Sequence, residues 1–96
     1  MKEFDGNDAQ YQIWLREHPD GFVLNRLRGK SDSYLVLHLT ICPSISTYNK
    51  MARPGGFTER KYIKVCATSI EPLKVYARKI GRSGGSFSGK CGRCNP

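Results

Sequence analysis

The stretches that decide the fold are His38–Cys42, which reads HLTIC, and Cys91–Cys94, which reads CGRC. Each stretch carries two residues of the types that bind zinc, and the short spacing lets both side chains bend toward one ion. Most of the second half of the chain lies between the two pairs, so a shared ion would close that whole segment. We therefore predict one zinc site with four ligands, which are His38, Cys42, Cys91 and Cys94.

The second pair has the spacing of a zinc knuckle, and Gly92 would make its turn easy. Lys90 and Arg93 stand beside the thiols and would lower their pKa. The alternatives are disulfide bonds, or a redox Cys-x-x-Cys motif, although no thioredoxin-like βαβ pattern surrounds it.

Two further residues of ligand type lie outside these pairs. Cys66 is in an apolar stretch, where we expect a small buried side chain, and it is the alternative to His38 as a ligand. His18 precedes Pro19 at the end of an expected helix, and we interpret it as a surface or capping residue.

The length of 96 residues indicates one small domain, whose core would be marginal without a metal or disulfides. The chain has no run of 18 apolar residues, so we expect no membrane span. The polar, acidic residues 1–6 lack the layout of a signal peptide, and a cytoplasmic location is expected. In that reducing compartment a Cys-x-x-Cys pair is more typical of metal binding than of a structural disulfide.

The net charge of +8 is unevenly distributed. Up to Asp20 there are five acids and two bases, about −3, whereas fourteen bases and three acids follow, about +11. A basic body of this kind indicates a partner rich in phosphate, with nucleic acid favoured over an anionic membrane surface. The alternative is that a basic small protein is merely soluble.

Periodicity and turn residues predict the secondary structure. A helix capped by Asn7 or Asp8 should run to Pro19, followed by strands over 22–28, 34–39 and 60–67. A second helix, capped by Thr68 or Ser69, should end at Gly81. The expected fold is α+β: a small zinc-stapled domain with a three-stranded, mainly antiparallel sheet and two helices. Residues 1–6 should be a flexible tail, and 7–96 a single zinc-binding domain.

The order of these elements resembles the N-terminal zinc domain of Ada-type methylphosphotriester-DNA repair proteins, and the related zinc modules attached to some nucleases. The matching features are a Trp-bearing helix, PDGFV at 19–23, a hairpin ending in His38-x-x-x-Cys42, and a closing Cys91-x-x-Cys94-x-Pro96. The resemblance covers roughly 11–96 and implies a zinc-stapled α+β fold that acts on DNA.

Two departures from that family limit what the resemblance implies. The family's methyl-accepting cysteine corresponds to His38, and an imidazole is not the thiolate nucleophile of that chemistry. The gap between Cys42 and Cys91 is also longer, with 44–61 as the expected insertion. Methyl transfer through the matching residue is therefore not expected, which leaves Cys42 as the alternative alkyl acceptor.

We expect a non-catalytic, zinc-stabilised module that binds nucleic acid, with DNA favoured, through bases on its loops and second helix. The loop over 44–60 mixes aromatic and basic residues that could stack on bases, although Tyr48 and Phe57 could instead fill the core. The candidate contact residues are Arg26, Arg28, Lys30, Tyr48, Lys50, Arg53, Arg60, Lys61, Lys64, Lys74, Arg78, Lys90 and Arg93.

The alternative function is a zinc-stabilised protein-interaction or regulatory adaptor. A separately encoded nuclease or other protein is a further expected partner. An enzyme is not expected, because the sequence offers no paired carboxylates near a histidine, no Gly-rich phosphate loop before a helix and no Ser-His-Asp set.

Overall fold

The computed structural model describes residues 1–29, 33–46 and 56–96, and its centre is a mixed sheet of five strands. The strand order is β1-β4-β2-β3-β5, in which β5 runs parallel to β3 and the other neighbours are antiparallel. The strands are β1 (Lys2–Phe4), β2 (Phe22–Leu27), β3 (Leu35–Leu39), β4 (Tyr62–Ala67) and β5 (Gly89–Lys90).

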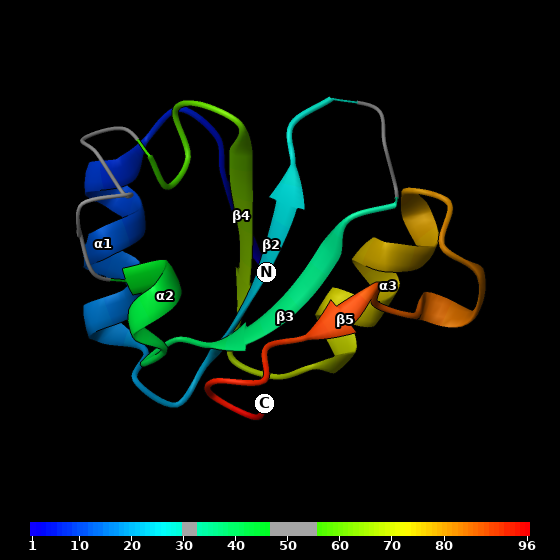
Figure 1. The fold of residues 1–96 in the computed structure, drawn as a ribbon. Coiled ribbons are helices and arrows are strands. Elements are labelled where there is room, and N and C mark those ends of the chain that lie inside the picture. The colour runs from blue at the N-terminus through cyan, green and yellow to red at the C-terminus, as the bar shows by residue number, and fades with distance from the viewer. Residues whose placement is uncertain (30–32, 47–55) are drawn as a thin grey trace.

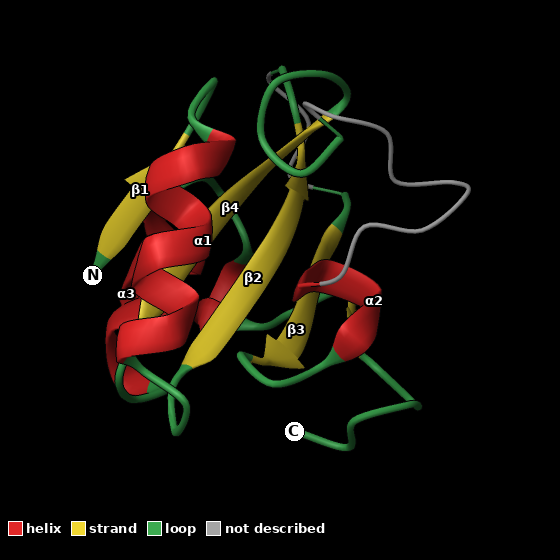
Figure 2. Cartoon of the chain, turned by 90° about the vertical axis from the view of Figure 1, so that its left-hand side faces the viewer, coloured by secondary structure: helices red, strands yellow, loops and turns green. Residues whose placement is uncertain are grey.

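Helices cover both faces of this sheet (Figure 1). Helices α1 (Asp8–Glu17) and α2 (Pro43–Ser46) lie on one face, as Figure 2 also shows, and α3 (Glu71–Lys79) lies on the other. The α+β class is confirmed. The predicted three-stranded sheet and two helices correspond to β2, β3, β4, α1 and α3, so the prediction of this architecture was incomplete.

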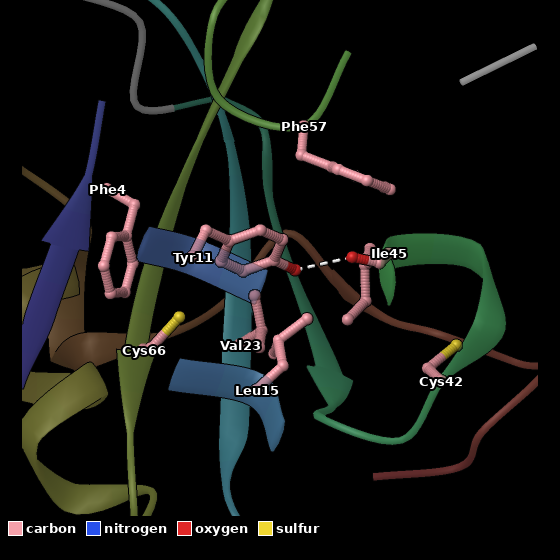
Figure 3. Close-up of a cluster of buried hydrophobic side chains, with 8 residues drawn as sticks. All are labelled: Phe4, Tyr11, Leu15, Val23, Cys42, Ile45, Phe57 and Cys66. Atoms are coloured by element: carbon pink, nitrogen blue, oxygen red, sulfur yellow. Dashed lines mark hydrogen bonds between the residues drawn. The ribbon is translucent and has the colours of Figure 1, made fainter. Parts of the chain in front are cut away.

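Alternation along the strands gives each face of the sheet its own core. Val23 and Cys66 point toward α1 and pack with Tyr11 and Leu15, as Figure 3 shows. The next residues along these strands, Leu24 among them, pack on the opposite side with Leu73 and Tyr76 of α3. A sheet covered on both faces has largely apolar strands, which is why β4 is buried along most of its length.

The beginnings of the two longer helices differ. Asn7 caps α1, since its Oδ1 accepts a hydrogen bond from the Gln10 backbone N–H at 3.1 Å, as predicted. The predicted cap of α3 by Thr68 or Ser69 is wrong, because Ile70 occupies the N-cap position without a side-chain hydrogen bond.

The sequence prediction missed the shortest elements. Residues 1–6, predicted to be a flexible tail, contribute β1, which pairs with β4 at the edge of the sheet. The Gly/Ser-rich segment after α3 contributes β5. Elements of two to four residues are too short to show hydrophobic periodicity, and contacts with distant segments hold them in place.

The short helix α2 is attached to α1 by one buried hydrogen bond. The Tyr11 side chain is fully buried, and its hydroxyl donates to the Ile45 carbonyl oxygen at 2.6 Å (Figure 3). This contact fixes α2 near the end of β3, where the chain leaves His38 and reaches Cys42.

Candidate metal centre

The first ligand pair is placed by β3 and the turn that follows it. His38 lies opposite Val23 of β2, so both side chains are on the face of α1 and α2. The Cys42 N–H then donates to the Leu39 carbonyl oxygen at 3.0 Å, which closes a turn just before α2. His38 is 7% exposed and Cys42 is 1% exposed, so the pair is buried.

The second pair is brought to the same place by β5. The strand runs beside β3, and the Cys91 N–H donates to the Leu37 carbonyl oxygen at 2.9 Å. The Leu39 N–H donates to Cys94 Sγ at 3.3 Å. Parallel pairing with β3 therefore carries the knuckle to the end of the strand that supplies His38.

The knuckle turn does not depend on the glycine that the sequence suggested. Gly92 is absent from the residues with positive φ, whereas Asn95 has φ +49° and donates its N–H to the Cys91 carbonyl oxygen at 3.0 Å. Asparagine tolerates the left-handed region better than most residues, so Asn95 is the conformationally demanding position.

The four predicted ligands converge. Their ligand atoms all lie within 4.8 Å of one another, which makes them a group able to hold a metal ion. The Sγ atoms of Cys42 and Cys91 are 3.9 Å apart, and all the cysteines are free. A disulfide needs about 2.05 Å between sulfurs. In contrast, two thiolates on a tetrahedral zinc with Zn–S bonds of about 2.3 Å stand about 3.8 Å apart.

His38 also fits a ligand role. Its Nδ1 is buried and has no hydrogen-bond partner among the residues that the structure describes. Burial, aided by the nearby Lys64 ammonium, lowers the pKa of His38 to about 4, so the imidazole is neutral at physiological pH. A neutral imidazole with an unpartnered nitrogen is the form that coordinates a metal.

The thiols compete with one another for ionisation. Burial raises the pKa of Cys91, but backbone N–H groups of Cys94 and Arg93 oppose it and bring the pKa to about 7. Burial raises the pKa of Cys94 to about 11, against the lowering effect of the hydrogen bond from the Leu39 N–H. A divalent cation would allow neighbouring thiolates to coexist, because each coordinated thiol is deprotonated. The Ser44 hydroxyl, 2.9 Å from Cys42 Sγ, is a further contact that sequence reasoning missed.

The other ligand-type residues lie elsewhere. Cys66 is buried on β4 beneath α1, where burial raises its pKa to about 12, and it does not belong to the group of converging ligands. The alternative with Cys66 in place of His38 is therefore not favoured. The His18 ring stacks on Trp14 at 4.1 Å, and its Nδ1 is 2.8 Å from the Trp14 carbonyl oxygen, in keeping with a role at the helix end.

Several predicted nucleic-acid contacts have structural partners instead. Lys64 is 2% exposed, and its Nζ donates to Asn25 Oδ1 at 2.8 Å and to the Phe57 carbonyl oxygen at 2.7 Å. The prediction that Lys64 contacts nucleic acid at the surface was wrong. Its buried ammonium instead hydrogen-bonds the segment around Phe57 to the sheet. Phe57 itself is buried in the core, as the alternative interpretation proposed.

Three other bases of the candidate list contact the protein. Arg26 donates to the Tyr76 hydroxyl at 2.7 Å, and Arg28 forms an ion pair with Asp5. Lys74 lies 3.4 Å from Glu71.

The remaining candidates divide into two groups. The exposed candidates among them are Arg60, Lys61, Arg78, Lys90 and Arg93. Lys30, Tyr48, Lys50 and Arg53 lie outside the described residues.

No family model, curated protein or solved structure matches this chain. The resemblance to the Ada-type domain thus rests on the residues and their order alone. Within the described residues, no helix has the length and apolar character that crossing a bilayer requires.

Proposed function

We propose that this protein is a non-catalytic, zinc-stabilised module that binds nucleic acid, with DNA as the expected form. The observation that carries the proposal is the convergence of His38, Cys42, Cys91 and Cys94 in a chain with a net charge of +8.

Zinc is the metal that this set of donors favours. Three thiolates and one imidazole are a common tetrahedral set for zinc, and a site filled by four protein ligands is typical of a structural role. The residues also join segments far apart in the chain, since the turn after β3 meets the end that follows β5. An ion here would stabilise the sheet edge and the C-terminal knuckle together.

Nucleic acid is favoured because the bases outnumber the acids by sixteen to eight. Two of the acids also have partners within the protein: Asp5 pairs with Arg28, and Asp8 accepts hydrogen bonds from Thr58. The exposed bases would then set the field around the molecule, and such a field attracts polyphosphates.

Two measurements test the proposal. Elemental analysis of the purified protein should give about one zinc per chain, because the cluster has one set of four ligands. Fluorescence-anisotropy titration with single-stranded and duplex DNA and RNA, at two salt concentrations, should show affinity that falls steeply with salt. Absence of zinc would contradict the metal assignment, and absence of binding at low salt would contradict the nucleic-acid assignment.

One observation favours the adaptor alternative. An open, largely apolar pocket of about 350 Å³ lies between the N-terminus and α3, lined by Met1, Pro72, Val75, Tyr76 and Lys79. Val75 is 41% exposed there, and such a surface suits a hydrophobic side chain of a protein partner. Zinc binding without nucleic-acid binding in the titration would favour this function.

A further inference from the structure

The bases are concentrated in the C-terminal quarter of the chain. From Pro72 to Pro96 there are six bases and no acid, whereas the first 20 residues hold five acids and two bases. Opposite charges therefore occupy different parts of the sequence. The six bases are Lys74, Arg78, Lys79, Arg82, Lys90 and Arg93.

The fold takes this segment from α3, along the β5 edge of the sheet, to the candidate metal centre. The chain leaves the end of α3, passes through a 3₁₀ turn at Ser83–Gly85 and enters β5 at the edge of the sheet. Figure 1 shows the orange segment and β5 on the side of the molecule away from α1, whereas the red residues after β5 lie below β3 near the middle of the view. We call the bases Arg78, Lys79, Arg82, Lys90 and Arg93 the β5-edge strip.

The Gly/Ser-rich loop within this strip is held in a defined shape. The Arg82 Nε donates to the Ser86 carbonyl oxygen at 2.8 Å, and Ser88 exchanges two hydrogen bonds with the Leu35 backbone, at 2.7 and 2.9 Å. Gly85, at φ +68°, fits so closely on α3 that an added Cβ would lie 2.8 Å from the Lys74 carbonyl oxygen.

That close fit also fixes a base of the strip. The same added Cβ at Gly85 would lie 3.1 Å from Arg78 Nη1, so the Arg78 guanidinium rests against the loop. These contacts hold Arg78 and Arg82 against the loop, in which Ser83 and Ser86 are exposed. Ordered donors lose less conformational entropy when they bind phosphate.

We infer that the β5-edge strip is the surface along which the phosphate backbone of a nucleic acid lies. Four of its five bases are exposed and Arg82 is half-buried. Guanidinium and ammonium groups beside serine hydroxyls match the hydrogen-bond acceptors of successive phosphates. This inference rests on the proposed function and identifies its contact surface.

The other exposed bases are less suitable for this role. Arg60 and Lys61 follow Glu59 directly, and the neighbouring Arg28 is already paired with Asp5. Acids beside these bases weaken the field that a phosphate would meet, whereas the strip has no acid in its own segment.

Charge-matched double variants test the inference. Arg78→Gln/Lys79→Gln removes two strip charges, Lys2→Gln/Arg16→Gln removes two from the acidic N-terminal part, and Arg60→Gln/Lys61→Gln removes two beside Glu59. A fluorescein-labelled mixed-sequence DNA, single-stranded and duplex, is titrated at several salt concentrations. The strip variant should bind about tenfold more weakly at low salt. The negative slope of log K against log salt should become shallower by about two. The other two should change less.

Folding is checked by metal content and melting temperature. If Arg78→Gln/Lys79→Gln is unstable, Lys79→Gln/Lys90→Gln keeps the Arg78 contact with the loop and should give the same loss. A strip variant that weakens binding no more than either comparison variant would overturn the inference while leaving nucleic-acid binding intact. Failure of the unmodified protein to bind any oligonucleotide would overturn both. Stronger binding to vesicles rich in phosphatidylserine than to DNA would overturn the choice of partner.

Discussion

Two polar clusters, one buried and one partly buried, lie on the same face of the sheet, and they are completed in different ways. In the first, Asp8 accepts hydrogen bonds from the Thr58 N–H at 2.7 Å, the Thr58 hydroxyl and the Phe57 N–H at 3.3 Å. Lys64 completes this cluster by donating hydrogen bonds to Asn25 Oδ1 and to the Phe57 carbonyl oxygen. In the second, three thiols converge with the His38 imidazole, whose buried Nδ1 has no hydrogen-bond partner within the described part of the chain.

The difference indicates which cluster requires something from outside the chain. Buried polar groups in folded proteins nearly always have partners, because an unmade hydrogen bond costs about 1–3 kcal/mol. The chain meets this requirement at Asp8 with its own atoms. At His38 it supplies converging ligand atoms instead, which is the arrangement that a metal ion completes.

The largest expected effect is the loss of one metal ligand. Cys91→Ser should abolish metal binding and lower the free energy of unfolding by several kcal/mol, enough to remove a cooperative thermal transition. Metal content and circular-dichroism melting measure this. Cys66→Ala is the matched control: it should keep the metal and cost about 1–2 kcal/mol. Equal metal content in the unmodified protein and in the Cys91→Ser variant would contradict the assignment of Cys91 as a metal ligand.

Changing the Asp8 cluster should lower the stability of the protein without changing its metal content. Asp8→Asn places an amide where Thr58 and Phe57 donate, and should lower the free energy of unfolding by about 3 kcal/mol. Urea denaturation measures this loss. Asp5→Asn is the control: Asp5 and Arg28 have side chains 50% and 39% exposed, so losing that pair should cost less than about 1 kcal/mol. If the two variants are equally stable, the Asp8 cluster contributes no special stability.

The two clusters also differ in how far the sequence reveals them. The four converging residues were predictable because each pair is close in sequence and few residue types bind zinc. The Asp8 cluster was not, since Thr58 lies 50 residues away and an aspartate at a helix start is ordinarily read as a cap. The fold divides similarly: the longer strands and helices show periodicity, whereas β1 and β5 are specified by pairing with distant strands.

Lys64 belongs to the first cluster and acts on the second through the pKa of His38. Burial lowers the pKa of Lys64 from 10.5 to about 8, although Asp8 opposes this. Between these pH values the unfolded chain binds more protons than the folded one, so the Lys64 contribution to stability rises with pH.

The expected rise is about 2 kcal/mol between pH 8 and 10.5, measured as the stability of the protein minus that of Lys64→Met. Taking the difference between the two proteins removes the ionisation of thiols and tyrosines that both share. A difference that falls with pH over this range, or stays flat, would contradict the lowered pKa of Lys64 in the folded state.

The smallest expected effects lie within the knuckle. The residue with left-handed backbone there is Asn95, whereas the sequence had suggested Gly92. Asn95→Ala should cost about 1 kcal/mol, because φ +49° is strained for residues with a Cβ, whereas Asn95→Gly should be near neutral. Gly92→Ala should change stability by less than about 0.5 kcal/mol, since its added Cβ would meet no atom within 4 Å. Urea midpoints at saturating zinc separate these variants. A Gly92→Ala variant less stable than Asn95→Ala would show that the turn depends on the glycine more than on the asparagine.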